Sequence, residues 1–142
     1  MNTERLYPSR RPRFASPLSP HLQIYRWSWT MAMSVFHRVT GVVLYGGITF
    51  LALLLAATAS GPEYFEMARS IFDSLLGTAA AIGFTWVLMH HMLGGVRHLI
   101  WDFGYGMEPL QRVRLARFTL VGSVSLTGLI WIVVYLIWRF HG

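Results

Sequence analysis

Three long stretches without a charged residue constrain this chain more than any other feature. They cover residues 39–62, 74–96 and 118–138, and each is bounded by charged side chains. A helix needs ~20 mostly apolar residues to span the hydrocarbon core of a bilayer, so each stretch is long enough. A core helix of a soluble protein would show a polar face, which charged residues would mark. The sequence therefore predicts an all-α integral membrane protein with three transmembrane helices.

The composition supports the same class and limits the chemistry. Hydrophobic residues make up 54% of the chain and charged residues 13%. A length of 142 residues predicts one domain, here a membrane anchor over residues 1–142. The absence of cysteine excludes disulfides, thiol catalysis and iron–sulfur ligation by this chain. We expect an N-terminal segment and three spanning helices, at about residues 1–28, 29–58, 74–101 and 115–138.

The arginines predict how the chain is oriented in the membrane. Ten of them lie within residues 1–38 and 97–117, whereas only two, Arg69 and Arg139, lie elsewhere. Because basic residues concentrate on the cytoplasmic side, the N-terminal segment should lie inside and the C-terminus outside. Between the first two spans, Gly61-Pro62-Glu63 is typical of one helix ending and another beginning. A short interfacial turn of helix should therefore lead into the second span.

The N-terminal segment also bears on the location of the protein. It carries four prolines and no continuous apolar run, which argues against a cleaved signal peptide and against the amphipathic helix of a transit peptide. We expect the inner (cytoplasmic) membrane of a bacterium, with the mitochondrial inner membrane as the alternative. The net charge of +6 fits contact with anionic lipid. Nucleic acid is not an expected partner, because the arginines are not gathered on one face.

Two polar side chains enter the first span together. Ser34 and Arg38 are four residues apart, so they share a helix face, which Gly41 continues. In a helix that starts near residue 29, Arg38 would lie ~13 Å along the axis, where an arginine needs a partner or water. A hydroxyl and a guanidinium beside a small residue can hold a polar head group at the inner rim of the membrane. The alternative is an arginine that snorkels to lipid phosphates and a serine bonded to its own helix.

A second polar set lies in the middle span. His91, Gly95 and His98 fall on one stripe of the helix. A neutral imidazole can ligate haem iron, and a glycine one turn away would admit a flat macrocycle; the alternative is a hydrogen bond between helices. His37 is a possible second axial ligand, but it adjoins Arg38 near the inner surface, so we expect another subunit to supply that ligand. Arg97, near the inner end of the span, would either snorkel or contact a haem propionate.

Three motifs carry a resemblance to a known family. They are Ser-Pro-Leu-Ser-Pro-His-Leu-Gln-Ile-Tyr-Arg at 16–26, Ser-Val-Phe-His-Arg-Val-Thr-Gly at 34–41, and His-Met-Leu-Gly-Gly-Val-Arg-His-Leu-Ile-Trp-Asp at 91–102. Together they resemble the cytochrome b subunit of succinate dehydrogenase, the larger of two membrane anchors of a succinate:ubiquinone oxidoreductase. The resemblance implies a non-flavin subunit of an enzyme of the respiratory chain and the tricarboxylic acid cycle, with no activity assigned to the isolated chain.

The resemblance also implies a cofactor, a substrate and partner subunits. His91 matches an axial ligand of haem b, and the opposite ligand would come from the small hydrophobic anchor, so that the three helices form part of a haem-binding bundle. Ser34, Val35 and Arg38 match residues of the ubiquinone site. Further positions that match the haem surroundings are His37, Arg38, Arg97 and His98. A flavoprotein and an iron–sulfur subunit would complete the complex, although Ser16-Pro17 departs from the usual Arg-Pro and leaves N-terminal docking to the iron–sulfur subunit open.

Three other functions are alternatives. A haem-free anchor would only tether a soluble enzyme and would show no b-type absorbance. The anchor of a quinol:fumarate reductase would share the same architecture, because the direction of catalysis is not encoded in the spans. A transporter subunit would require more helices and a repeated pair of broken helices, which the chain lacks.

Overall fold

The computed structural model describes residues 27–141, which form four helices and no strand. The helices are α1 (Trp29–Ala59), α2 (Pro62–Asp73), α3 (Leu75–Asp102) and α4 (Pro109–His141). Of these, α1, α3 and α4 are long and apolar enough to cross a membrane. The prediction of an all-α membrane protein with three spanning helices is confirmed. The motif at 16–26 lies outside the described residues.

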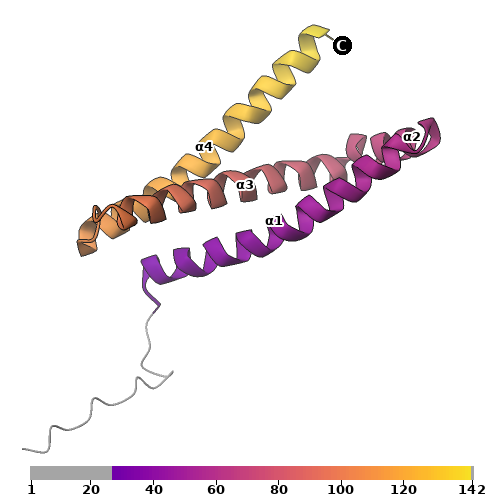
Figure 1. Ribbon diagram of the computed structural model, residues 1–142. Helices are drawn as coiled ribbons and strands as arrows, with labels where there is room; N and C mark the ends of the chain where they lie inside the picture. Colours follow the sequence, from indigo (N-terminus) through magenta and orange to yellow (C-terminus); the bar gives the residue numbers. More distant parts are fainter. Residues whose placement is uncertain (1–26, 142) are drawn as a thin grey trace, which may run out of the picture.

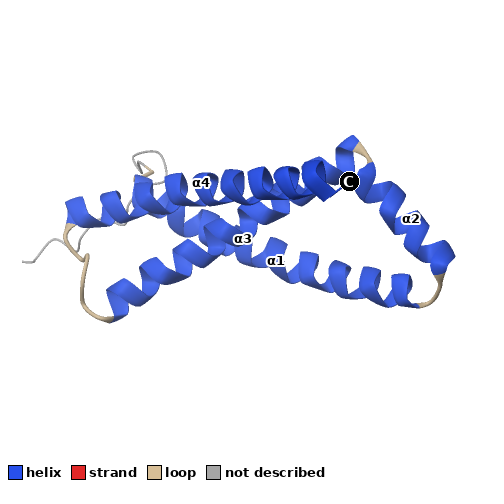
Figure 2. Ribbon diagram, turned by 90° about the horizontal axis from the view of Figure 1, so that it is seen from above, coloured by secondary structure: helices blue, strands red, loops and turns tan. Residues whose placement is uncertain are grey.

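Helix α3 is the central element, and it contacts the other three helices. It lies between α1 and α4, and α4 separates from it toward the C-terminus (Figure 1). Helices α1 and α3 cross and then diverge toward the end of the molecule that carries α2, where α2 bridges them (Figure 2). The crossing of α1 and α3 brings residues that are distant in sequence close together, and the candidate site is built there.

Two glycines of α1 allow α1 and α3 to approach each other. A Cβ at Gly41 would lie 3.1 Å from Cε1 of His91, and a Cβ at Gly47 would overlap the ring of Phe84. Small residues serve this purpose in membranes because lipid is as apolar as the side chains, so close packing replaces hydrophobic burial as the attraction between helices.

The contact between α3 and α4 uses small and hydroxyl-bearing residues. On α4 the buried positions follow a helical stripe, and they are Ala116, Thr119, Ser123 and Thr127. The three hydroxyls donate to backbone carbonyls of their own helix at 2.8–2.9 Å. Because the membrane core supplies no water, these internal bonds satisfy groups that would otherwise be unpaired.

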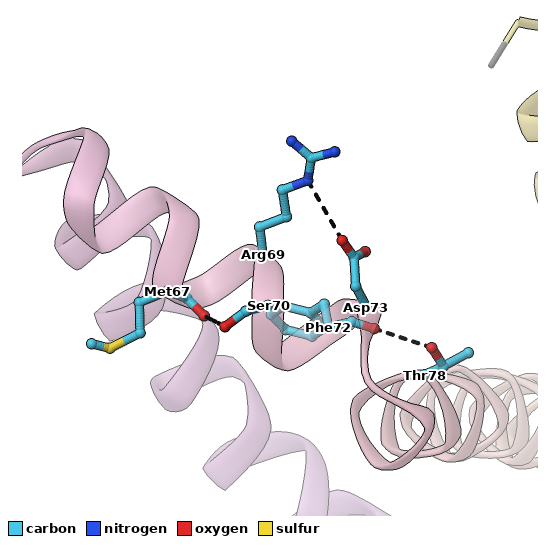
Figure 3. Close-up of polar contacts among 6 residues, drawn as sticks. All are labelled: Met67, Arg69, Ser70, Phe72, Asp73 and Thr78. Atoms are coloured by element: carbon cyan, nitrogen blue, oxygen red, sulfur yellow. Dashed lines mark hydrogen bonds and ion pairs between the residues drawn. The ribbon is translucent and has the colours of Figure 1, made fainter.

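Helix α2 is a separate amphipathic helix. It begins with Pro62 at its first turn and has Glu63 there, as the helix-start signal indicates. Its polar face includes Arg69 and Asp73, whose Nε and Oδ2 atoms lie 3.5 Å apart (Figure 3). We expected a turn of helix continuous with the second span. The structure instead breaks the chain at Ser74, whose extended backbone ends α2 and begins α3.

The corner between α2 and α3 is closed by specific bonds. Ser74 Oγ accepts a hydrogen bond from the Gly77 amide at 3.0 Å. Thr78 Oγ1 donates to the Phe72 carbonyl at 3.1 Å, as Figure 3 shows. A Cβ at Gly77 would overlap the carbonyl oxygen of Ile71, so only glycine fits there. The corner therefore depends on the absence of a side chain at position 77.

Helix α4 is longer at both ends than the expected range of about 115–138. It starts at Pro109, after a turn in which Gly104 and Gly106 have positive φ values of 81° and 75°. The expected range was based on the uncharged apolar stretch, so most of the arginine-containing residues before that stretch were left out of the predicted helix. Charged side chains mark where a helix leaves lipid, but they do not end it, since arginine is a good helix former.

Candidate functional site

The histidines at the crossing of α1 and α3 lie against one another. The rings of His37 and His91 stack with their centroids 4.3 Å apart and their planes 9° apart. His98 lies seven residues after His91 on α3, and its ring centroid is 5.1 Å from that of His37. We call His37, His91 and His98 the histidine cluster. Two of its members are the stripe expected on the second span, and the third comes from the Ser-Val-Phe-His-Arg-Val-Thr-Gly motif.

His91 is hydrogen-bonded through one ring nitrogen only, among the described residues. Its Nδ1 lies 3.2 Å from the His37 carbonyl oxygen and 3.1 Å from Thr40 Oγ1. Among residues 27–141, its Nε2 makes no hydrogen bond and is not one of the buried unpaired atoms. The face of α3 beside it is open, because a Cβ at Gly95 would meet nothing within 4 Å. One ring nitrogen is thus engaged by α1, and the other is available to a ligand.

This arrangement fits a haem better than a bare metal ion. An axial histidine ligates iron through one nitrogen while the other is hydrogen-bonded, as at His91. Within the described part of the chain, no group of three or more His, Cys, Asp or Glu side chains is placed to hold a metal ion. His37 Nε2 is buried without a partner among the described residues, and it packs against α3 at Gly94, where a Cβ would lie 2.9 Å from it.

Arg97 and His90 are both buried on α3, on either side of Gly94, against which the His37 ring packs. Arg97 is only 3% exposed, and its guanidinium carbon lies 5.2 Å from the centre of the Trp101 ring. A snorkelling Arg97 is therefore not what the structure shows. No hydrogen bond or ring contact joins it to the histidine cluster within residues 27–141. His90 is 1% exposed, and its Nδ1 lies 3.4 Å from Ser123 Oγ of α4.

The candidate quinone residues lie near the start of α1, on a surface that no other described helix covers fully. Arg38 is exposed, Val35 is 37% exposed and Ser34 is half-buried. Among residues 27–141 the only ion pair joins Arg69 and Asp73, so Arg38 has none. The Ser34 hydroxyl makes no hydrogen bond to the described residues, whereas hydroxyls such as Thr49 bond their own helix. The structure thus does not show the bond within the helix that was the alternative for Ser34.

The sequence reasoning missed Thr40. This residue is 3% exposed, and it connects the backbone of His37 to the ring of His91. Its position three residues after His37, on the same turn of α1, was the available signal. What the sequence alone did not show was that α3 crosses α1 at this turn.

Known proteins similar to this chain match it over a region that includes the candidate site residues of α1 and α3. The family model described as "Succinate dehydrogenase/Fumarate reductase transmembrane subunit" matches residues 12–136. The succinate dehydrogenase cytochrome b556 subunit of Paracoccus denitrificans is 39% identical over 119 residues, which cover 84% of this chain and 92% of that protein. The mitochondrial cytochrome b560 subunit of Sus scrofa is 42% identical over 119 residues, covering 80% of this chain and 70% of that protein.

A relative with lower sequence identity matches a similar share of this chain. The succinate dehydrogenase cytochrome b556 subunit of Rickettsia felis is 32% identical over 117 residues, which cover 82% of this chain and 90% of that protein. Relatives occur in both bacteria and mitochondria, and all three are named as subunits of one enzyme complex. Because the family model and these relatives cover most of the chain, it belongs to the family of succinate dehydrogenase/fumarate reductase transmembrane subunits.

Proposed function

We propose that this chain is the cytochrome b anchor of a succinate dehydrogenase complex, that His91 ligates haem b, and that Ser34, Val35 and Arg38 form part of a ubiquinone-reduction site. The observation that carries the haem assignment is the state of His91: Nδ1 is engaged by α1, and Nε2 has no partner among the described residues. The names of the relatives, cytochromes b556 and b560, support the same cofactor.

The residues of this chain would bind the haem from one side. His91 would ligate the iron through Nε2, and Gly95 would leave room for the macrocycle. His37, whose ring stacks on that of His91, would lie beside the haem propionates. When bound, a haem supplies a one-electron redox centre. As the resemblance of the motifs implies, a small hydrophobic anchor subunit would supply the second ligand.

Ser34 and Arg38 would bind the head group of the quinone. A hydroxyl and a guanidinium are both hydrogen-bond donors, and a quinone oxygen is an acceptor whose negative charge grows on reduction. Donors aimed at a developing charge stabilise it most in a water-poor site. Val35 would contribute an apolar wall. A flavoprotein and an iron–sulfur subunit would deliver the electrons on the arginine-rich side, with the N-terminus inside.

The haem assignment is tested by replacing His91 in the purified complex. His91→Leu should abolish the reduced b-type absorbance or change it strongly, because it removes the axial nitrogen. His141→Leu is the matched control, since His141 is exposed at the far end of α4, and it should leave the spectrum unchanged. An unaltered spectrum in His91→Leu would remove the ligand assignment, and a wild-type complex without b-type absorbance would favour the haem-free anchor.

A further inference from the structure

Thr40 occupies a buried position between the backbone of α1 and the ring of His91. Its Oγ1 lies 2.8 Å from the His37 carbonyl oxygen and 3.1 Å from His91 Nδ1. The His37 carbonyl oxygen is also 3.2 Å from His91 Nδ1. Three polar atoms, from two helices, therefore form one closed hydrogen-bonding group, and Thr40 is the only side chain in it besides His91.

The protons of this group can be assigned from its donors and acceptors. A carbonyl oxygen only accepts, so the 2.8 Å contact requires the single hydroxyl proton of Thr40. With its proton directed to the carbonyl, Thr40 Oγ1 can only accept from His91 Nδ1. The other neighbour of Nδ1, the His37 carbonyl oxygen, is also an acceptor. Both neighbours of Nδ1 thus need a proton from the ring, which places the hydrogen on Nδ1.

A hydrogen on Nδ1 leaves a lone pair on Nε2 of the neutral ring. This is the tautomer that ligates a metal through Nε2, and the group bonded to the other nitrogen fixes both the tautomer and the ring orientation. A flipped ring would place a C–H group against the two oxygens and leave both without a donor from His91. The contacts of Thr40 therefore favour one orientation and one protonation state.

We propose that Thr40 is a positioning residue for His91: it holds the Nδ1-protonated tautomer and directs the Nε2 lone pair toward a haem iron. The proposal rests on the proposed haem site and adds to it a residue of the other helix. The ring is confined on its remaining sides by the stacked ring of His37 and by the space left at Gly41, where a Cβ would lie 3.1 Å from Cε1. These contacts limit where the ring lies, and Thr40, together with the His37 carbonyl, favours Nδ1 as the nitrogen that faces α1.

The test compares Thr40→Val and Thr40→Ser in the intact, purified complex. Valine has the shape of threonine without the hydroxyl, so it removes the shorter of the two acceptor contacts of Nδ1–H and leaves only the His37 carbonyl, and serine restores the hydroxyl. Outer-shell partners of metal-ligating histidines typically contribute ~10–100-fold in affinity. We expect Thr40→Val to lose haem to an excess of apomyoglobin roughly tenfold faster than wild type. Its haem midpoint potential should also shift upward, because a less electron-rich imidazole stabilises the oxidised iron less.

A matched control lies on the same helix. Thr49 Oγ1 donates to the Tyr45 carbonyl at 2.9 Å and touches no histidine, so Thr49→Val removes the same kind of hydroxyl without the ring contact. Thr49→Val and Thr40→Ser should both keep the wild-type potential and rate of haem loss. Thr40→Ala provides a second hydroxyl-free variant that needs no extra space, for the case in which Thr40→Val does not assemble.

The outcomes separate this proposal from the haem assignment itself. Wild-type values in Thr40→Val and Thr40→Ala would overturn the role of Thr40 while leaving His91 as a ligand. The same shift in Thr40→Ser as in Thr40→Val would also overturn it, because the hydroxyl would then be irrelevant. A wild-type complex without haem, or a normal spectrum in His91→Leu, would instead refute the proposed haem site.

Discussion

At the scale of single residues, the hydroxyl-bearing and charged side chains of the spanning helices fall into two groups. Some have a hydrogen-bond or ion-pair partner among the described residues, and others have none. Thr40, Thr119 and Ser123 donate to carbonyls of their own helices. Ser34 and Arg38 find no partner among residues 27–141. Hydrocarbon offers no hydrogen bonds, so such groups in a span face water, lipid head groups or a ligand. This difference is the structural support for a head-group site at the start of α1.

Arg38 is the residue whose removal distinguishes the quinone site from a general role in assembly. Arg38→Ala should lower quinone reduction by the complex by ~100-fold, the usual effect of removing a donor aimed at a developing charge. Electron transfer from succinate to a water-soluble dye should be nearly unchanged, because it precedes the membrane step. The measurement is the ratio of the two activities in purified complex.

Arg139→Ala is the control for this substitution, since Arg139 is an exposed arginine in the last turn of α4. It should leave both activities near their wild-type values. Equal losses of quinone and dye reduction in Arg38→Ala would indicate failed assembly, and would contradict a role for Arg38 in binding the quinone.

At the scale of elements, the corner between α2 and α3 shows how one residue permits a connection. Ser74 ends one helix and caps the next, and its side chain accepts from the Gly77 amide. The carbonyl of Ile71 lies where a side chain at position 77 would be. The amphipathic α2 can therefore turn directly into the spanning α3 with no loop between them.

Gly77→Ala should open this corner and destabilise the chain by roughly 1–3 kcal/mol, the range for a group forced into a packed site. Gly83→Ala, on the same helix, should be neutral or slightly stabilising, because a Cβ at Gly83 meets nothing within 4 Å and alanine favours helix by up to ~1 kcal/mol. Thermal unfolding of both variants in mild detergent measures the difference. Equal midpoints for the two variants would show that the contact with Ile71 is not limiting.

At the scale of the whole molecule, the three spanning helices leave most of their surface uncovered. In each apolar window only 11% of the residues are buried within the chain. Large exposed side chains such as Val42, Tyr45 and Phe118 line these surfaces. In a bilayer such surfaces meet lipid tails or the helices of other subunits, which agrees with membership of a family of anchor subunits.

The orientation of the whole molecule is a prediction from its arginines. Ten of the twelve lie within residues 1–38 and 97–117 of the sequence, which three spans would bring to one side of the membrane. In a bacterial host, alkaline phosphatase fused after α4 should be active, and a fluorescent protein fused there should be dark. Fusions placed at the N-terminus should behave in the opposite way. An active phosphatase at the N-terminus would reverse the predicted topology.

The number of spans and the identity of the family could be read from the sequence because both depend on local properties. An uncharged apolar run of sufficient length must form its own backbone hydrogen bonds in lipid, whatever its neighbours are. The motifs around His37 and His91 are likewise contiguous in the chain. A helix start such as Pro62 is also local, and it falls where the sequence indicates.

The contacts between helices were decided only by the tertiary structure. In a soluble protein the apolar face of a helix shows which side turns inward, but in lipid every side of a span is apolar, so that signal is lost. Thr40 and His91 are 51 residues apart, and nothing in their separate helices shows that they meet. The burial of Arg97 and the break at Ser74 likewise depend on how neighbouring helices pack. Length and motif are properties of one segment, whereas the rotation of each helix about its axis is set by the helices beside it.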